Sequence, residues 1–238
     1  MAAKSMVSIG NAWPRSSTAP SSSACRASPS NKSGIIHPIW REAREFQSAG
    51  GAPSRGTTPR FEPSKTEAME RPMVDTIRYA FGDSSLGRFA VARSARGLVL
   101  VAFDADTDQL EAQFPEADLV EDAATLRATI GKLVHLIDHP EDAPGIVLDL
   151  RGTDFECRVW HALREVPAGT TATYGEIASR LGVPRQAREV GEACAANRLA
   201  VVVPCHRVVK KDGSISGYRW GVRRKRVLLE REHRARLL

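Results

Sequence analysis

The sequence predicts an α+β protein in which a small antiparallel sheet precedes a helical domain. Two observations support this: short β-type runs follow Met73, and apolar residues recur at helical spacing from Thr153 onward. The composition divides the chain further, because residues 1–73 are rich in Ser, Pro, Ala and Gly and have no long apolar run. We therefore expect a disordered or dispensable extension over 1–73, an α/β domain over 74–152 and a helical domain over 153–238.

Three runs of apolar and β-branched residues predict the strands of the sheet, over 76–81, 88–92 and 97–103. Gly82-Asp83 and residues 95–97 separate them as turns. An acidic loop is expected next, followed by a helix over 123–138, where apolar residues recur three and four positions apart. A last strand of this domain is expected over 146–150.

The second domain is predicted to contain a helix-turn-helix, which follows a first helix over 153–163. Thr173 begins a Thr-Tyr-Gly-Glu sequence with the form of a capping box, which opens the first of the two helices. Gly182 ends this helix, and Pro184 is placed to begin the next one, which is expected over 185–197.

The second helix of this motif has an unusual composition for an exposed surface. Ala187 and Gly191 lie on its exposed side, with Arg188 as a long cation among them. Small residues allow another backbone to come close, so tight packing between helices is one interpretation. DNA contact is the other, because the second helix of a helix-turn-helix normally enters a groove of DNA. The basic segment that follows favours DNA contact.

Basic residues are concentrated at the C-terminal end of the chain, whose formal net charge is +6. Residues 185–238 contain 14 Lys or Arg and 5 Asp or Glu, so this segment carries +9 and the rest of the chain −3. This distribution suits a polyanion held through phosphate contacts, although an ordinary solvated basic surface is an alternative. No apolar run reaches the roughly 20 residues of a membrane span, so we expect no membrane partner.

A cysteine next to a histidine, in an apolar and irregular segment, is the most informative feature of the sequence. Cys205 and His206 follow Pro204, which interrupts regular structure. A neutral His within reach can take the proton of a thiol, and the resulting thiolate is a nucleophile. A lone buried Cys is more often a small apolar core residue, and we expect that role for Cys157 and Cys194.

A Cys–His pair also needs a third group that orients the imidazole. Glu230 and Glu232, near the C-terminus, are both candidates, and the residues alone leave the choice open. The four cysteines show no CxxC spacing, and His135 with His139 would supply only two ligands. We therefore expect no metal site and no cofactor.

A longer pattern surrounds the Cys–His pair, and it consists of Asn197, the run Pro-Cys-His-Arg-Val-Val over 204–209, Gly213, the run Ser-Gly-Tyr over 216–218 and Glu232. This pattern resembles the active-site domain of the O6-alkylguanine-DNA alkyltransferases, in particular the branch that includes the bacterial adaptive-response proteins. The resemblance covers about residues 77–232. It implies a ribonuclease H-like first domain and a winged helix-turn-helix-like second domain.

The resemblance implies a role for each residue of the catalytic set. Cys205 matches the alkyl acceptor, and His206 matches the base that acts through a water molecule. Glu232 matches the carboxylate that orients and charges His206. Asn197 matches the side chain that bridges the helix-turn-helix to the active-site turn.

The resemblance also implies contacts with DNA in the minor groove. Arg188 matches the finger that enters the duplex and fills the space left by an extruded base. Ala187 and Gly191 match small residues that let the helix approach the groove. Tyr174 matches the residue that rotates the nucleotide and donates to the guanine, and Tyr218 lies in the loop that closes over it.

These roles together imply a DNA repair protein that transfers an alkyl group irreversibly from O6-alkylguanine to its own cysteine, with O4-methylthymine as a second candidate substrate. The expected partner is double-stranded DNA containing O6-alkylguanine, and the expected state is a monomer. The expected location is the cytoplasm and nucleoid, or the nucleus of a eukaryote. The first 41 residues contain no Asp or Glu, as is typical of organelle transit peptides, so targeting to an organelle by this extension is an alternative. A lesion-flagging protein without transfer, a helix-turn-helix regulator and a cysteine hydrolase are the alternatives.

Overall fold

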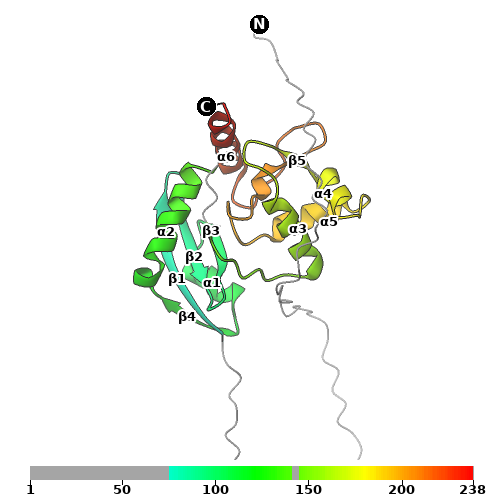
Figure 1. Cartoon of the computed structure of the whole chain (residues 1–238). Coiled ribbons are helices and arrows are strands. Elements are labelled where there is room, and N and C mark those ends of the chain that lie inside the picture. Colours follow the sequence, from blue (N-terminus) through cyan, green and yellow to red (C-terminus); the bar gives the residue numbers. More distant parts are fainter. Residues whose placement is uncertain (1–74, 141–144, 238) are drawn as a thin grey trace, which may run out of the picture. The chain divides into compact units, whose positions relative to one another are not determined.

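The computed structural model describes residues 75–140 and 145–237, so the extension predicted over 1–73 lies outside the described residues. The described part contains a four-stranded sheet with two helices and then a helical region (Figure 1), which confirms the α+β class. The elements of the first region are β1 (Asp75–Ser84), β2 (Gly87–Arg93), β3 (Leu98–Phe103), α1 (Thr107–Gln113), β4 (Ala117–Glu121) and α2 (Ala123–Asp138). Across 75–140 and 145–237, no helix is long and apolar enough to cross a membrane.

The sheet is mixed, with the strand order β3-β2-β1-β4. β1 pairs with β2 and β2 with β3 in antiparallel fashion, as predicted, whereas β4 pairs with β1 in parallel. The prediction of an all-antiparallel sheet was therefore wrong for the fourth strand, which lies in the segment expected to be an acidic loop. β4 is an edge strand with largely exposed side chains, so its acidic residues obscure the alternation that identifies strands.

The turn between β1 and β2 lies at Ser85 and Leu86, and the turn predicted at Gly82-Asp83 was wrong. Gly82 lies inside β1, where a Cβ atom would come within 2.8 Å of Ile130 Cγ2 in α2. The glycine therefore marks a close approach between the strand and a helix rather than a turn.

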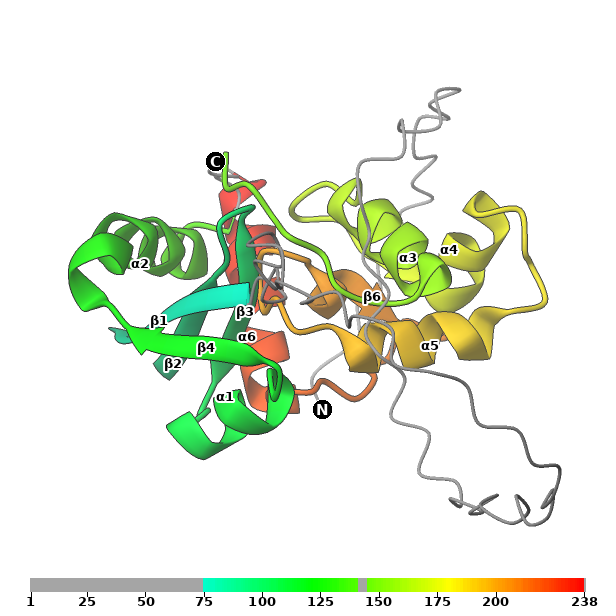
Figure 2. The same ribbon diagram turned by 90° about the horizontal axis from the view of Figure 1, so that it is seen from below.

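The two faces of the sheet are covered by different helices (Figure 2). α2 packs on one face through Leu126 and Leu133, and α1 packs on the other through Leu110. The strand predicted over 146–150 is reduced to a single bridge between Leu98 and Leu148.

The second region contains the predicted helix-turn-helix. Its elements are α3 (Asp154–Arg164), β5 (Ala172–Thr173), α4 (Tyr174–Arg180), α5 (Ala187–Ala196), η1 (Cys205–Arg207), β6 (Val208–Val209) and α6 (Val222–Ala235). Capping boxes at Thr153 and Thr173 open α3 and α4, as the spacing of Thr and Glu requires. α5 begins later than predicted, because Pro184 lies in the turn before it, where Gln186 N donates to Val183 O.

Two segments on either side of α3 meet the edge of β3. Leu98 N donates to Val147 O (2.9 Å), and Val101 N donates to Arg198 O (2.9 Å). Ala200 N in turn donates to Val101 O (2.9 Å). The chain that leads from α5 to Cys205 therefore starts on the edge of the sheet.

Candidate active site

Cys205 begins the 3-10 turn η1, which follows α5. Its side chain is buried, with 5% of the residue exposed. The backbone before it is fixed by hydrogen bonds from Val203 N to Leu199 O (3.0 Å) and from Cys205 N to Val203 O (2.8 Å). The sulfur is thus held at a defined point of an irregular segment.

The side chain of Asn197 connects the end of α5 to this segment. Its Nδ2 donates to Val203 O (3.0 Å) and lies 3.2 Å from Cys205 Sγ, and its Oδ1 accepts from Leu199 N (2.8 Å). Asn197 is almost completely buried, so these contacts satisfy polar atoms that water cannot reach. The resemblance implies a bridge at this position.

Burial raises the pKa of the Cys205 thiol to about 11. The hydrogen bond from Asn197 and the positive charge of Lys225 act in the opposite direction, but they do not offset burial. At neutral pH the thiol is therefore protonated in the resting protein. It needs a proton acceptor before it can act as a nucleophile.

His206 and Glu232 form a completely buried pair. His206 Nε2 lies 2.8 Å from Glu232 Oε1, and both side chains are 0% exposed. Burial lowers the pKa of His206, and the Glu232 carboxylate only partly counters this. His206 is therefore neutral at pH 7. Glu230, the other candidate carboxylate, is exposed.

The Glu232 carboxylate has further donors besides His206. Arg207 Nε donates to both of its oxygens (3.0 and 3.1 Å), and Gly169 N donates to Oε2 (3.1 Å). Burial acts to raise the pKa of Glu232, but His206, Arg207 and Gly169 together hold it below its usual value. Glu232 therefore stays ionised although it is buried.

The ionised state of Glu232 fixes the tautomer of His206. A carboxylate has no proton to donate, so the hydrogen of the short contact belongs to His206 Nε2. Nδ1 is then the nitrogen with a free lone pair. It is buried and has no hydrogen-bond partner among the described protein groups. This nitrogen can accept a proton without breaking the contact with Glu232.

Arg207 was not identified from the sequence as a member of the site. Besides Glu232, it binds two backbone carbonyls: Nη1 donates to Val166 O (2.6 Å) and Nη2 to Pro140 O (3.2 Å). Its position directly after His206 was the available signal, because a cation there is placed to meet the carboxylate that orients the imidazole.

Lys225 is a second residue that the sequence reasoning missed. Its ammonium group is buried, and it donates to Ser216 Oγ (2.7 Å) and to Val208 O. Tyr174 OH donates to the same Ser216 Oγ (2.7 Å). Burial lowers the pKa of Lys225. Lys225 lies seven positions before Glu232 in α6, so helical periodicity already places both on one face.

Tyr218 and Cys194 lie in the packed surroundings of the site. The Tyr218 ring meets the His206 ring edge-on, with 6.4 Å between centroids, and it packs in the same way on Trp220 at 5.2 Å. The Tyr218 hydroxyl oxygen is buried. Cys194 is buried on the inner side of α5, as expected of a core residue, and Cys157 in α3 is buried too.

Three of the residues predicted to contact DNA, Ala187, Arg188 and Gly191, lie on α5. The Arg188 side chain is 89% exposed and pairs only loosely with Glu192, at 3.2 Å. Ala187 and Gly191 are partly exposed. A Cβ atom on Gly191 would lie 3.7 Å from Tyr174 Cε1, which is an ordinary contact. Packing among the described residues therefore does not require a glycine here.

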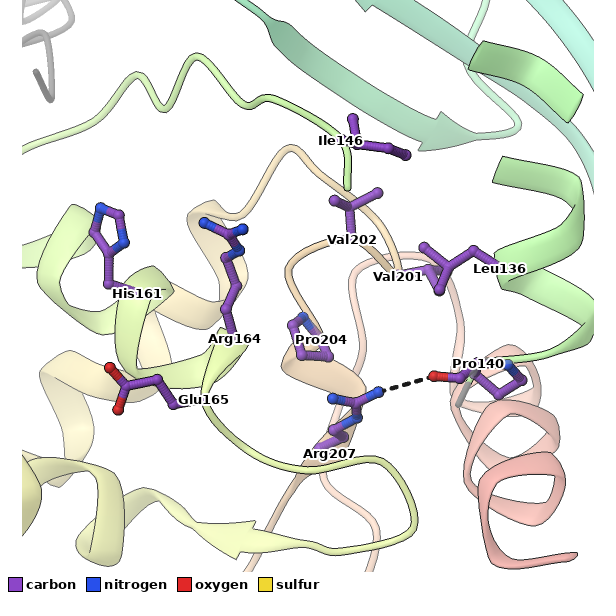
Figure 3. A pocket seen from close by; sticks show the side chains of 10 residues that line it. All are labelled: Leu136, Pro140, Ile146, His161, Arg164, Glu165, Val201, Val202, Pro204 and Arg207. Carbon is purple, nitrogen blue, oxygen red and sulfur yellow. Dashed lines mark hydrogen bonds between the residues drawn. The ribbon is translucent and has the colours of Figure 1, made fainter. Parts of the chain in front are cut away.

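A pocket of about 360 Å³ is lined in part by the segment that carries Cys205. Val201, Pro204 and Arg207 line it from this segment, and Leu136 lines it from α2 (Figure 3). Cys205 does not line this pocket, so the pocket is separate from the thiol. Val201 has a φ of 66°, a left-handed conformation that costs a β-branched residue energy and that packing must enforce.

The second region matches a known protein family. Residues 154–234 match the family model described as 6-O-methylguanine DNA methyltransferase, DNA binding domain. The bifunctional transcriptional activator and DNA repair enzyme Ada of Escherichia coli is 41% identical over 160 residues, which are 66% of this chain and 45% of Ada. The chain thus spans less than half of that relative's length.

Shorter relatives match over most of their length. The inducible methylated-DNA–protein-cysteine methyltransferase of Bacillus subtilis is 35% identical, over 62% of this chain and 85% of the relative. The crystal structure of Mycobacterium tuberculosis OGT in complex with DNA superposes with a TM-score of 0.58 and 35% identity, over 67% of this chain and 93% of OGT. The match to most of the B. subtilis protein, together with the family model over the region of the Cys–His–Glu cluster, means that the chain belongs to the O6-methylguanine DNA methyltransferase family.

Proposed function

We propose that this chain repairs DNA by transferring the methyl group of O6-methylguanine to its own Cys205 in a single turnover. One observation carries the proposal: a buried cysteine lies in the same short turn as a neutral histidine. Nε2 of this histidine binds an ionised glutamate, which leaves Nδ1 to accept a proton. This cluster falls within the segment that matches the family's DNA-binding domain. The Bacillus subtilis relative is a methylated-DNA–protein-cysteine methyltransferase.

In the proposed reaction, Cys205 Sγ attacks the methyl carbon, the bond from this carbon to O6 breaks, and a thioether forms. The thiol proton passes through a water molecule to Nδ1 of His206, and Glu232 stabilises the imidazolium. The departing guanine anion takes up a proton at N1 from solvent, so that its O6 becomes a carbonyl, and the His206 imidazolium then releases the thiol proton to solvent. Tyr174 can donate a hydrogen bond to the guanine instead of to Ser216 Oγ, its present partner.

The pKa of Cys205 explains why the base is needed. With a pKa of about 11, only about one thiol in ten thousand is ionised at pH 7. Proton transfer to His206 during the attack removes this limit. Because a thioether is not readily hydrolysed, each molecule reacts once.

The O6 atom of guanine lies within the base stack, so the nucleotide must leave the duplex to meet a buried thiol, which costs a few kcal/mol. The exposed side of α5 suits this task. Ala187 and Gly191 leave room for close approach to the minor groove, and the extended Arg188 side chain can occupy the gap. Double-stranded DNA containing O6-alkylguanine is the proposed partner.

The direct test is the mass of the protein before and after incubation with a duplex that contains O6-methylguanine. We expect a gain of one methyl group per molecule, located on the peptide with Cys205. Cys205→Ala should gain nothing but still bind the duplex, and Cys194→Ser should react fully, since its thiol lies outside the catalytic cluster. A methyl group on any other residue, or none, contradicts the proposal. A duplex with O4-methylthymine tests the second candidate substrate.

Substitution of Glu232 tests how the proton is removed. Burial already lowers the pKa of His206, and loss of the carboxylate should lower it further. We expect Glu232→Gln to transfer methyl roughly 100-fold more slowly. The acid limb of its rate profile should move to lower pH, because transfer is lost only where His206 is protonated. Glu230→Gln, on the exposed face of α6, is the matched control. An unchanged profile in Glu232→Gln would show that Glu232 is only structural.

Substitution of Arg188 separates base extrusion from phosphate binding. If Arg188 fills the gap in the duplex, Arg188→Ala should slow transfer from duplex DNA by roughly tenfold or more. Transfer from a single strand of the same sequence should be nearly normal, because no base has to leave a paired stack. A phosphate contact predicts instead weaker binding and a salt slope lower by about one unit. Equal slowing on both substrates would contradict the intercalating role.

A further inference from the structure

α6 carries two sets of contacts on adjacent faces. Lys225, Leu228 and Glu232 are buried at positions three and four residues apart, and two of them belong to the active site. Arg224 and Arg231, seven residues apart, form the neighbouring face, and both bind the first region of the protein. In Figures 1 and 2, α6 lies between the sheet and the helix-turn-helix.

Arg224 attaches the start of α6 to the sheet. Its Nη1 and Nη2 bind the two carboxylate oxygens of Asp104 (2.6 and 2.9 Å), and its Nε donates to Leu86 O (2.8 Å). The guanidinium lies 4.8 Å from the centre of the Phe103 ring. A bidentate pair with a third contact defines the position of the helix more strictly than a single ion pair.

Arg231 attaches the end of α6 in a similar way. Its Nη1 donates to Ile137 O (2.6 Å) and to Asp138 Oδ1 (3.1 Å), and its Nη2 donates to Ser85 Oγ (2.9 Å). Ser85 and Leu86 form the turn between β1 and β2, so one turn of the sheet contacts both arginines. The two attachment points are about 10 Å apart along the helix.

We infer that Arg224 and Arg231 are positioning residues for alkyl transfer. They fix the rotation of α6 about its axis and its position along that axis, and thereby the contact of Glu232 with His206. Glu232 directly follows Arg231, so a rotation of α6 that moved one would move the other. A hydrogen bond of 2.8 Å is weakened by a shift of a few tenths of an ångström. The first region would then influence the reactivity of a thiol that belongs to the second region. This inference rests on the proposed function for its kinetic consequence only.

The test compares variants of the two faces of α6. Arg224→Ala and Arg231→Ala should each transfer methyl from a saturating duplex roughly tenfold more slowly, with the acid limb of the rate profile moved to lower pH. Asp104→Asn, which weakens the ion pair with Arg224 from the other side, should slow transfer and move the acid limb in the same direction but to a smaller extent. Arg223→Ala and Arg226→Ala remove the same charge from exposed positions of α6 and should behave as wild type.

The combination with Glu232→Gln decides whether the arginines act through the carboxylate. In that background, Arg224→Ala should cause little further slowing, because the contact it positions is already lost. If the double variant is slower by the product of the two separate fold-changes, the inference is overturned. So would variants with a lower denaturation midpoint but a normal rate and pH profile, since these would show a purely structural role.

A second readout does not need the reaction. The ¹⁵N titration of His206 should move to lower pH in Arg224→Ala and Arg231→Ala and stay unchanged in Arg223→Ala. An unmoved titration overturns the inference even if wild-type protein transfers no methyl. Absence of transfer by wild-type protein would instead count against the proposed function, so the two failures are distinguishable.

Discussion

The buried carboxylate of Glu232 is the interaction on which the site depends. An isolated carboxylate in a protein interior costs several kcal/mol and would normally bind a proton. Glu232 stays ionised because His206, Arg207 and Gly169 N all donate to it. These donors come from the turn that carries Cys205 and from the loop after α3, while Glu232 itself comes from α6. One charge therefore holds three distant segments together.

The two ends of α6 carry buried groups of opposite charge. Near its start, Lys225 places a buried cation against Ser216 and Val208. Two turns later, Glu232 places a buried anion against His206. The charge of Lys225 acts to lower the pKa of the Cys205 thiol, and Glu232 acts to raise the pKa of His206. α6 thus carries both the charged group that acts on the thiol and the charged group that acts on the imidazole.

Local signals in the sequence were sufficient for much of the fold. The first three strands, α2 and the two capping boxes follow from patterns that span only a few residues. β4 could not be predicted, because its pairing with β1 is long-range and its side chains are largely exposed. The break before α5 was misplaced, since a proline fits both the first turn of a helix and the turn that precedes it.

The site was predictable where chemistry and family pattern coincide. Cys205, His206, Asn197 and Glu232 lie together, and the sequence alone had left Glu230 as a rival. Arg207 and Lys225 were missed for a common reason: charged side chains are usually exposed. The three-dimensional arrangement identifies the groups that these two residues bind, which are the Glu232 carboxylate for Arg207 and Ser216 and Val208 for Lys225.

Burial keeps His206 neutral, and ionised Glu232 holds its proton on Nε2, which leaves a free lone pair on Nδ1. ¹⁵N-NMR of the unmodified protein, with labelled histidine assigned through the loss of one signal pair in His206→Gln, measures this directly. The account predicts a protonated Nε2 and an unprotonated Nδ1 at pH 7, with titration below the usual histidine pKa. An imidazolium at pH 7, or a proton on Nδ1, would contradict it.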